Sequence, residues 1–130
     1  EGAFDLINAF DVLYHIVDDA RWERAVRTLA AAVAPRGTLL LTDTLADNSG
    51  IASHNRARSL TRYRTLLEDE GLEITALYPT HVLLNRALGP LRFLNRLPWL
   101  LYGVDRALLA MGAGTNDPVV SKLLVARRTR

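Results

Sequence analysis

Apolar residues along the chain fall alternately into short runs and into helical repeats. Residues 4–10 and 38–42 are short, predominantly apolar runs, which are typical of strands buried in a sheet. Between them, residues 21–33 predict a helix with one apolar face, because apolar side chains recur there every three or four positions. Pro35 and Gly37 are expected to end that helix. Its apolar positions are Trp22, Ala25, Val26, Leu29 and Val33.

The second half of the chain continues this alternation. Ser59 suits the N-cap of a second helix, and Gly71 suits the left-handed position that follows its end. Residues 72–78 and 119–126 are predicted to be further strands, the latter rich in Val and Leu. Between these two strands lies an apolar segment, residues 85–116, which contains several arginines and is broken by proline and glycine. We expect one or two helices in this insert.

The order strand, helix, strand, helix, strand, helical insert, strand predicts an α/β fold. Strands that alternate with helices imply a parallel sheet with helices on its faces. The right-handed crossover rule then places successive strands side by side. The last strand follows its predecessor without an ordinary crossover helix, so we expect it to run antiparallel to the others.

The composition describes an ordinary globular domain. The chain has 130 residues, of which 49% are hydrophobic and 23% charged, and this excludes disordered, collagen-like and mucin-like proteins. It has no cysteine, so a disulfide scaffold, a thiolate metal site and a cysteine nucleophile are excluded; the absence is compatible with the cytoplasmic location that we expect. The formal charge of +2 is too small to indicate a nucleic-acid partner.

Several familiar sites have no counterpart in the sequence. No glycine-rich phosphate loop follows a strand, and neither GxxxxGK[ST] nor HExxH occurs. The three histidines, His15, His54 and His81, are too scattered to indicate a metal site, and we expect none. No uninterrupted apolar stretch approaches the ~20 residues that span a bilayer, so we expect no transmembrane segment.

The residues that follow the first strand suit a binding site. Ligands of open α/β sheets bind outside the carboxyl ends of the strands. Phe10, Asp11, Tyr14 and His15 fall at that position behind the first strand, and Asp43 ends the second. We expect Phe10, Asp11 and His15 to cluster with Asp43 at one end of the sheet. In the alternative interpretation, Asp11 only caps a turn and His15 packs at the entrance of the helix.

Three motifs occur in an order that resembles a known family. The segment FDLINAFDVLYHIVDD, residues 4–19, resembles the fourth-strand motif FDxVxxxxVLxHI of class I S-adenosylmethionine-dependent methyltransferases. PRGTLLLTD, residues 35–43, looks like the fifth-strand motif P-x-G-x-L-L-x-x-D, and LLEDEGLEI, residues 66–74, is similar to the LLxxAGF segment that enters the sixth strand. The closing strand, residues 122–126, agrees with the seventh.

The resemblance implies a partial Rossmann-like sheet made of strands four to seven. Residues 1–130 are then the carboxyl-terminal part of a methyltransferase domain, which in the complete protein transfers a methyl group from S-adenosylmethionine to a small-molecule acceptor. The family's glycine-rich loop and the acidic residue of its second strand do not occur in this sequence. We therefore expect this chain alone to be inactive and to bind the cofactor weakly. The rival hypothesis is a non-catalytic α/β interaction module that binds no cofactor.

The resemblance also implies roles for individual residues. Ala9, Phe10 and Asp11 lie near the cofactor, since the family's fourth strand ends beside the sulfonium. The resemblance places Asp43, at the fifth-strand terminus, beside the substrate. Apart from the resemblance, Tyr14, Arg56 and Arg58 are also expected at the substrate.

Two histidines are candidates for the group that takes a proton from an oxygen or nitrogen acceptor, because histidine exchanges protons near neutral pH. His15 matches the motif histidine, and His54 stands just before the second helix. We expect His54, Arg56 and Arg58 to face an acidic or phosphorylated acceptor. The alternative is a loop histidine accompanied by two solvated arginines.

Two surfaces are expected to carry partners. The insert of residues 85–116 is too apolar for a solvated loop, so we expect a lid over the acceptor pocket or a subunit interface; the alternative is a segment that lies on a membrane surface. Trp99, Leu100 and Tyr102 should then be largely buried. The first strand lacks the neighbour that it has in the family, so we also expect self-association through its free edge.

Overall fold

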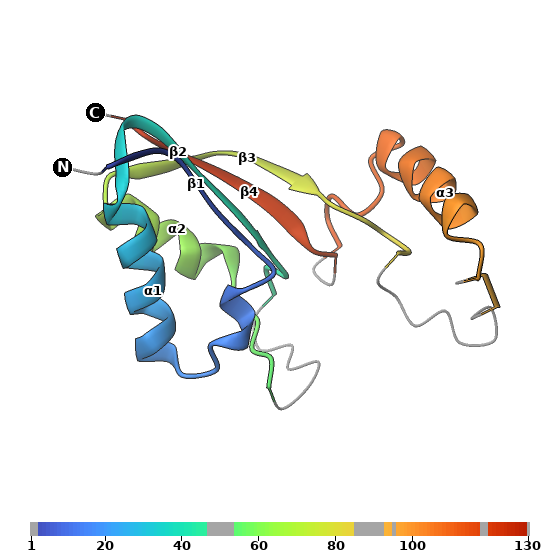
Figure 1. Cartoon of the computed structure of the whole chain (residues 1–130), viewed down its shortest axis with the longest axis horizontal. Coiled ribbons are helices and arrows are strands. Elements are labelled where there is room, and N and C mark those ends of the chain that lie inside the picture. Colours follow the sequence, from blue (N-terminus) through green and yellow to red (C-terminus); the bar gives the residue numbers. More distant parts are fainter. Residues whose placement is uncertain (1–2, 47–53, 85–92, 95, 118–119, 130) are drawn as a thin grey trace.

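The computed structural model describes residues 3–46, 54–84, 93–94, 96–117 and 120–129, and it has the mixed α/β architecture that the sequence predicts (Figure 1). Strands alternate with helices as far as the third strand, and a further helix lies between the last two strands. The elements are β1 (Phe4–Phe10), the 3₁₀ turn η1 (Leu13–His15), α1 (Asp19–Ala31), β2 (Val33–Asp43), α2 (Leu60–Asp69), β3 (Leu72–Pro79), α3 (Pro98–Ala110) and β4 (Lys122–Arg128).

The ends of α1 and α2 follow from local capping chemistry. Asp18 accepts a hydrogen bond from the backbone N–H of Arg21 at 2.8 Å, and the Ser59 hydroxyl caps α2 in the same way. Gly71 adopts a φ of +76° behind α2. The first helix ends at Ala31, two residues before the predicted end at Val33, and the expectation that Pro35 and Gly37 end it was wrong, because both lie within β2. The carbonyl of Ala32, the residue before β2, accepts the backbone N–H groups of Ala3 and Phe4. These bonds hold the start of β2 beside the start of β1.

The sheet has the strand order β1-β2-β4-β3. β1 and β2 are parallel, and β4 is antiparallel to both of its neighbours, as expected for the last strand. The expectation that successive strands lie side by side was wrong for β2 and β3, because β4 lies between them. The crossover rule fixes the hand of the connection but not adjacency. A central place suits β4, whose Leu124 and Ala126 are fully buried.

Both α1 and α2 pack against the same face of the sheet (Figure 1). Trp22 and Val26 of α1 and Tyr63 and Leu67 of α2 meet the buried side chains of the strands there. On the opposite face Phe4, Leu6, Phe10 and Tyr78 are exposed, and none of the described helices covers them. β1 is an edge strand, and its outer edge pairs with no described strand. Self-association through that edge stays a prediction.

Gly37 lies where β2 makes an unusually close approach to its surroundings. A Cβ at this position would come within 2.8 Å of the Ala34 carbonyl oxygen and 3.0 Å of the Phe4 carbonyl oxygen. Backbone atoms cannot give way as a flexible side chain can. We expect Gly37→Ala to lower the free energy of unfolding by about 2 kcal/mol, as overpacking does.

Gly103 provides the matched control for this substitution. A Cβ at Gly103, inside α3, meets nothing within 4 Å, so Gly103→Ala should raise stability by about 1 kcal/mol through helix propensity. Urea titrations of both variants measure the two effects. Equal stability of the two variants would show that a Cβ is tolerated at position 37 despite the short distances to backbone oxygens.

The insert forms one described helix, α3, which stands at the far end of the molecule from α1 (Figure 1). The expectation that Trp99, Leu100 and Tyr102 are buried was wrong for burial against the sheet or a pocket, since they are 69%, 36% and 54% exposed; burial against a second chain stays a prediction. Helical geometry explains this, because the side of α3 that faces inward is the one bearing Leu101 and Asp105. Part of the insert, residues 85–92 and 95, lies outside the described residues. Among the described helices, none has the length and hydropathy of a membrane span.

Candidate functional site

The parallel strands β1 and β2 end together, and their carboxyl ends bring the predicted site residues to one place. Phe10 pairs with Thr42 in the register, so Asp11 and Asp43 follow at the same end of the sheet, as expected. The backbone N–H of Asp11 donates to Thr42 Oγ1 at 2.8 Å, and the Thr42 hydroxyl donates to Asp11 Oδ1 at 3.2 Å. Asp11 has a φ of +53°, a left-handed conformation that aspartate tolerates better than most residues.

Asp43 is a buried carboxylate with an unusual set of partners. It is 1% exposed; Oδ1 accepts the backbone N–H of Thr44 at 2.7 Å, and Oδ2 accepts a short hydrogen bond from the hydroxyl of Tyr63. The Tyr63 hydroxyl in turn accepts the indole N–H of Trp22 at 3.3 Å. A continuous chain of hydrogen bonds therefore connects both helices to the carboxyl end of β2.

Burial governs the proton affinity of this carboxyl group. Loss of water raises the pKa of Asp43 to about 6, and the nearby charge of Asp11 adds to the rise. The hydrogen bonds from Tyr63 and Thr44 act in the opposite direction, because they stabilise the ionised form. The pKa of Tyr63 is raised as well, first by burial and then by the charge of Asp43. Asp43 therefore exchanges its proton within one to two pH units of neutrality.

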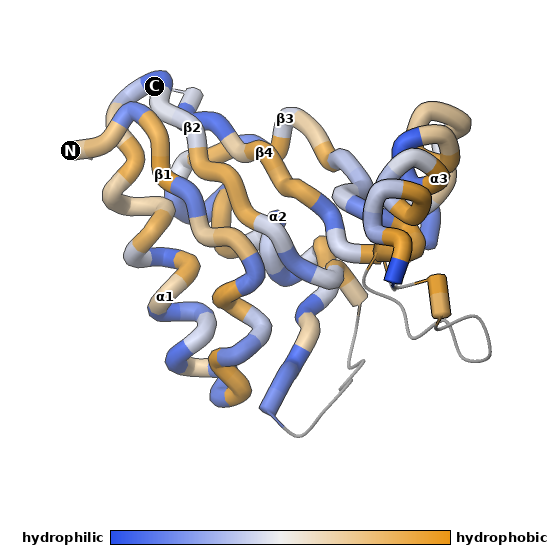
Figure 2. The backbone as a smooth tube through the Cα atoms, turned by 45° about the vertical axis from the view of Figure 1, so that its right-hand side comes forward, coloured by the Kyte–Doolittle hydropathy of each residue, from blue (hydrophilic) through white to orange (hydrophobic). Residues whose placement is uncertain are grey.

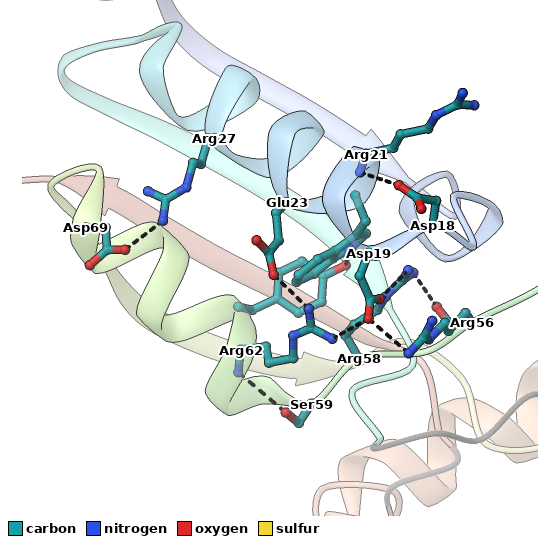
Figure 3. Close-up of polar contacts among 12 residues, drawn as sticks. Asp18, Asp19, Arg21, Glu23, Arg27, Arg56, Arg58, Ser59, Arg62 and Asp69 are labelled. Carbon is teal, nitrogen blue, oxygen red and sulfur yellow. Dashed lines mark hydrogen bonds and ion pairs between the residues drawn. The ribbon is translucent and has the colours of Figure 1, made fainter.

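Asp19, at the start of α1, is the centre of an arginine network that lies beside the hydrogen bonds joining Trp22, Tyr63 and Asp43 (Figure 3). Its carboxylate lies 3.0 Å from Arg56, 3.1 Å from Arg58 and 3.4 Å from Arg62. Burial pushes its pKa upward, but the Arg58 hydrogen bond and the charges of Arg62 and Arg56 prevail and lower the pKa of Asp19. The network joins α1 to α2 and to the segment before α2.

The structure places Arg58 and Arg56 differently within this network. Arg58 is 1% exposed, donates to the Val17 and Arg56 carbonyls and lies 5.0 Å from the centre of the Trp22 ring. Arg56 is partly exposed. The described contacts give Arg58 a role in holding the segment before α2 in place; contact of either arginine with an acceptor stays a prediction.

The two candidate histidines lie close together although 39 residues separate them in the sequence. The backbone N–H of Arg56 donates to the Tyr14 carbonyl at 2.8 Å, which holds the segment before α2 against η1. The rings of His15 and His54 are consequently 6.3 Å apart and nearly parallel, and both residues are exposed. Tyr14 lies beside His15, and its pKa is raised by burial and by the charges of Asp11 and Asp43. The sequence predicted these residues singly; the structure brings them together.

A pocket of about 330 Å³ opens where β2 ends and β4 begins. Lys122, which pairs with Asp43 in the β2–β4 register, lies in its wall; this lysine is 9% exposed and donates to the Asp117 carbonyl at 2.8 Å. The other lining residues are Leu45, Leu60, Leu77, Pro79, Thr115 and Asn116. A larger hollow of about 500 Å³ runs along the outer side of α1, away from the strand ends.

Sequence reasoning missed the pocket and the supports of Asp43. The apolar wall residues look like ordinary core positions in the sequence, and the only signal for Lys122 was a cation at the start of an otherwise apolar strand. The sequence pattern places Trp22 on an apolar helix face, which does not reveal its indole N–H as a donor or the Tyr63 hydroxyl as its partner. Among the described residues, no three acidic or histidine side chains gather as metal ligands would.

Comparison with known proteins agrees with this geometry. The family model for methyltransferase domains matches residues 1–86. N-methyltransferase NodS from Bradyrhizobium japonicum WM9 has a TM-score of 0.57 at 17% identity, over 100% of this chain and 53% of its own. An O-methyltransferase family protein from Burkholderia thailandensis has a TM-score of 0.55 at 15% identity, over 98% of this chain and 31% of its own.

Mitomycin 7-O-methyltransferase MmcR has a TM-score of 0.52 at 21% identity, over 98% of this chain and 30% of its own. No curated protein sequence matches the chain. The chain thus spans between 30% and 53% of these three solved proteins, and at such identities the likeness shows the fold. Because the family match covers more than half of the chain and the neighbours share its fold, the chain belongs to the family of methyltransferase domains and has the class I methyltransferase fold.

Proposed function

We propose that, in the complete protein, the common end of β1 and β2 binds S-adenosylmethionine and that its methyl group passes to a small-molecule acceptor. The observation that carries the proposal is the junction of Asp11, Thr42 and Asp43 at the end of two parallel strands, on a methyltransferase fold. Ligands of such sheets bind at this position. S-adenosylmethionine supplies a positively charged sulfonium, whose methyl group is already activated for transfer.

The side chains at this end fit a cationic cofactor. Asp11 is exposed and its carboxylate is held in place by Thr42, so a negative charge is fixed beside the strand end. Phe10 is 48% exposed and presents an aromatic ring, which attracts a cation through its π electrons. Ala9 is partly buried and packs against the core just before Phe10. These residues would bind and orient the cofactor, and proximity then contributes most of the rate.

The pocket beside Asp43 supports a small acceptor. Its volume of about 330 Å³ falls in the range of small-molecule sites, and its four apolar residues beside Thr115, Asn116 and the cation of Lys122 would suit a hydrophobic molecule that carries an anionic or polar group. The solved neighbour MmcR is named for methyl transfer to mitomycin. His15, whose ring centre lies 4.4 Å from that of Tyr14, and the neighbouring His54 are the proposed bases: an imidazole nitrogen would take the proton that an O–H or N–H acceptor loses on methylation.

The test uses the complete protein, S-adenosylmethionine with a labelled methyl group and a panel of small phenols, alcohols and amines. We expect calorimetry to show cofactor binding and the panel to contain a methylated acceptor. His15→Ala or His54→Ala should lower turnover roughly 100-fold without weakening cofactor binding, because general base catalysis contributes about that factor. The control is Arg64→Gln, on the exposed side of α2, which should leave turnover unchanged.

The outcomes separate the hypotheses. Failure of the complete protein to bind S-adenosylmethionine would overturn the proposal and favour a non-catalytic interaction module. Cofactor binding and methyl transfer with near-normal turnover in both histidine variants would keep the activity but exclude a histidine base.

A further inference from the structure

α3 presents an apolar surface to solvent. Trp99 is 69% and Met111 75% exposed, although such side chains are ordinarily buried. Figure 2 shows the hydrophobic stretches of α3 at the edge of the molecule, away from the core between the sheet and α1. The residues that form this surface, called here the α3 surface, are Leu97, Trp99, Leu100, Tyr102, Val104 and Met111.

The apolar side chains are arranged along the helix and are not scattered over it. Leu97, Leu100 and Val104 follow one another at spacings of three and four residues, and Met111 continues the line two turns later, so they share one side of α3. Trp99 lies about 100° and Tyr102 about 160° around the helix from Leu100, so the exposed apolar side chains extend over much of the solvent-facing side of α3. A contiguous surface of this kind marks a binding site, whereas single exposed apolar residues need no explanation.

The charges around the α3 surface have one sign. Arg96 and Arg106 are exposed, and the Arg106 guanidinium lies 5.9 Å from the centre of the Tyr102 ring. The only acid in residues 80–116 is Asp105, against four arginines in the same segment. Asp105 is 2% exposed, and its oxygens accept the backbone N–H groups of residues 82, 83 and 84 at 2.9, 2.7 and 3.3 Å. The carboxylate of Asp105 is therefore buried and bound to backbone N–H groups. The groups that α3 exposes to solvent are apolar, aromatic or cationic.

We propose that the α3 surface docks on an anionic lipid membrane, with α3 lying in the plane of the interface. Tryptophan and tyrosine suit the boundary between headgroups and acyl chains, and arginine places its aliphatic stem in the apolar layer while its head reaches the lipid phosphates. Charge complementarity favours this partner over a second copy of the chain, because two α3 surfaces carry the same positive sign and repel each other. The inference goes beyond the proposed function, which requires no membrane.

The test measures binding of the protein to phosphatidylcholine vesicles with and without about one third phosphatidylglycerol, which lowers the surface potential. We expect co-sedimentation with the anionic vesicles, weakened by salt. Arg96→Gln and Arg106→Gln should each lower the partition coefficient about fivefold, the contribution of one basic residue near such a surface. Arg64→Gln, on the exposed side of α2, is the matched control and should leave binding unchanged.

Tryptophan fluorescence reports which residue enters the lipid. Trp99 emission should shift to shorter wavelength with anionic vesicles, and Trp99→Phe should abolish the shift while retaining binding, because phenylalanine keeps an apolar ring. Trp22 is 0% exposed and serves as the internal reference. Two results would overturn the proposal: no binding to anionic vesicles by the folded protein, or a concentration-dependent shift of Trp99 without lipid, which would identify a second copy as the occupant.

Discussion

Trp22→Ala is expected to lower the free energy of unfolding by about 4 kcal/mol, the typical cost of removing a buried tryptophan. Trp22 is 0% exposed and packs edge-on against the ring of Tyr63, with 4.9 Å between ring centres. Its indole N–H donates to the Tyr63 hydroxyl, and two arginine side chains lie about 5 Å from its ring centre. Alanine would leave a cavity at the junction of α1, α2 and the sheet.

Two variants separate the contributions at this position. Trp22→Phe retains a ring but removes the N–H donor, so it should cost less than the alanine variant and still leave the Tyr63 hydroxyl with one partner fewer. Trp99→Ala is the matched control, because Trp99 is 69% exposed and its loss should change stability by less than about 0.5 kcal/mol. Urea titration gives the three values. A cost below about 1 kcal/mol for Trp22→Ala would mean that the structure closes the cavity.

The sequence predicted those features of the fold that depend on local chemistry. Ser59 caps α2 as expected, and Asp18 caps α1 in the same way, because a cap needs only an oxygen within three residues of a free N–H. The site at the ends of β1 and β2 was predictable for a similar reason: two parallel strands joined by a helix end at the same edge wherever the rest of the chain lies.

Features that depend on distant partners were not predictable in this way. The place of β4 between β2 and β3 rests on pairings that span much of the chain, and its apolar run would suit an edge or a centre equally. The role of Tyr63 likewise depends on a carboxylate 20 residues earlier. Apolar density in residues 85–116 indicated burial, whereas the structure exposes Trp99 and Tyr102, because hydropathy does not tell which side of a helix faces the protein.

Asp43 is expected to make stability fall as the pH rises from about 4 to about 6. Its pKa is raised from 3.8 to about 6 by burial, so the folded state holds this proton more tightly than the unfolded state does. A group of this kind contributes its full stabilisation below the unfolded pKa and loses it as the pH rises through the folded pKa. The shift of about two pH units corresponds to roughly 3 kcal/mol between acid and neutral pH. Asp19, whose pKa is lowered, acts in the opposite direction at lower pH.

Asp43→Asn should remove this dependence, because the amide cannot ionise while its oxygen still accepts from Tyr63. Tyr63→Phe should act differently. The Tyr63 hydroxyl stabilises the carboxylate, so its loss raises the pKa of Asp43 further and extends the decline in stability toward higher pH. Urea unfolding at a series of pH values measures all three curves. If wild type and Asp43→Asn had parallel curves between pH 4 and 6, Asp43 would be ionised throughout, and the hydrogen bonds from Tyr63 and Thr44 would outweigh its burial. Asp43 would then not gain or lose a proton near neutral pH. The charge beside Asp11, where the cofactor is proposed to bind, would not change with pH through Asp43.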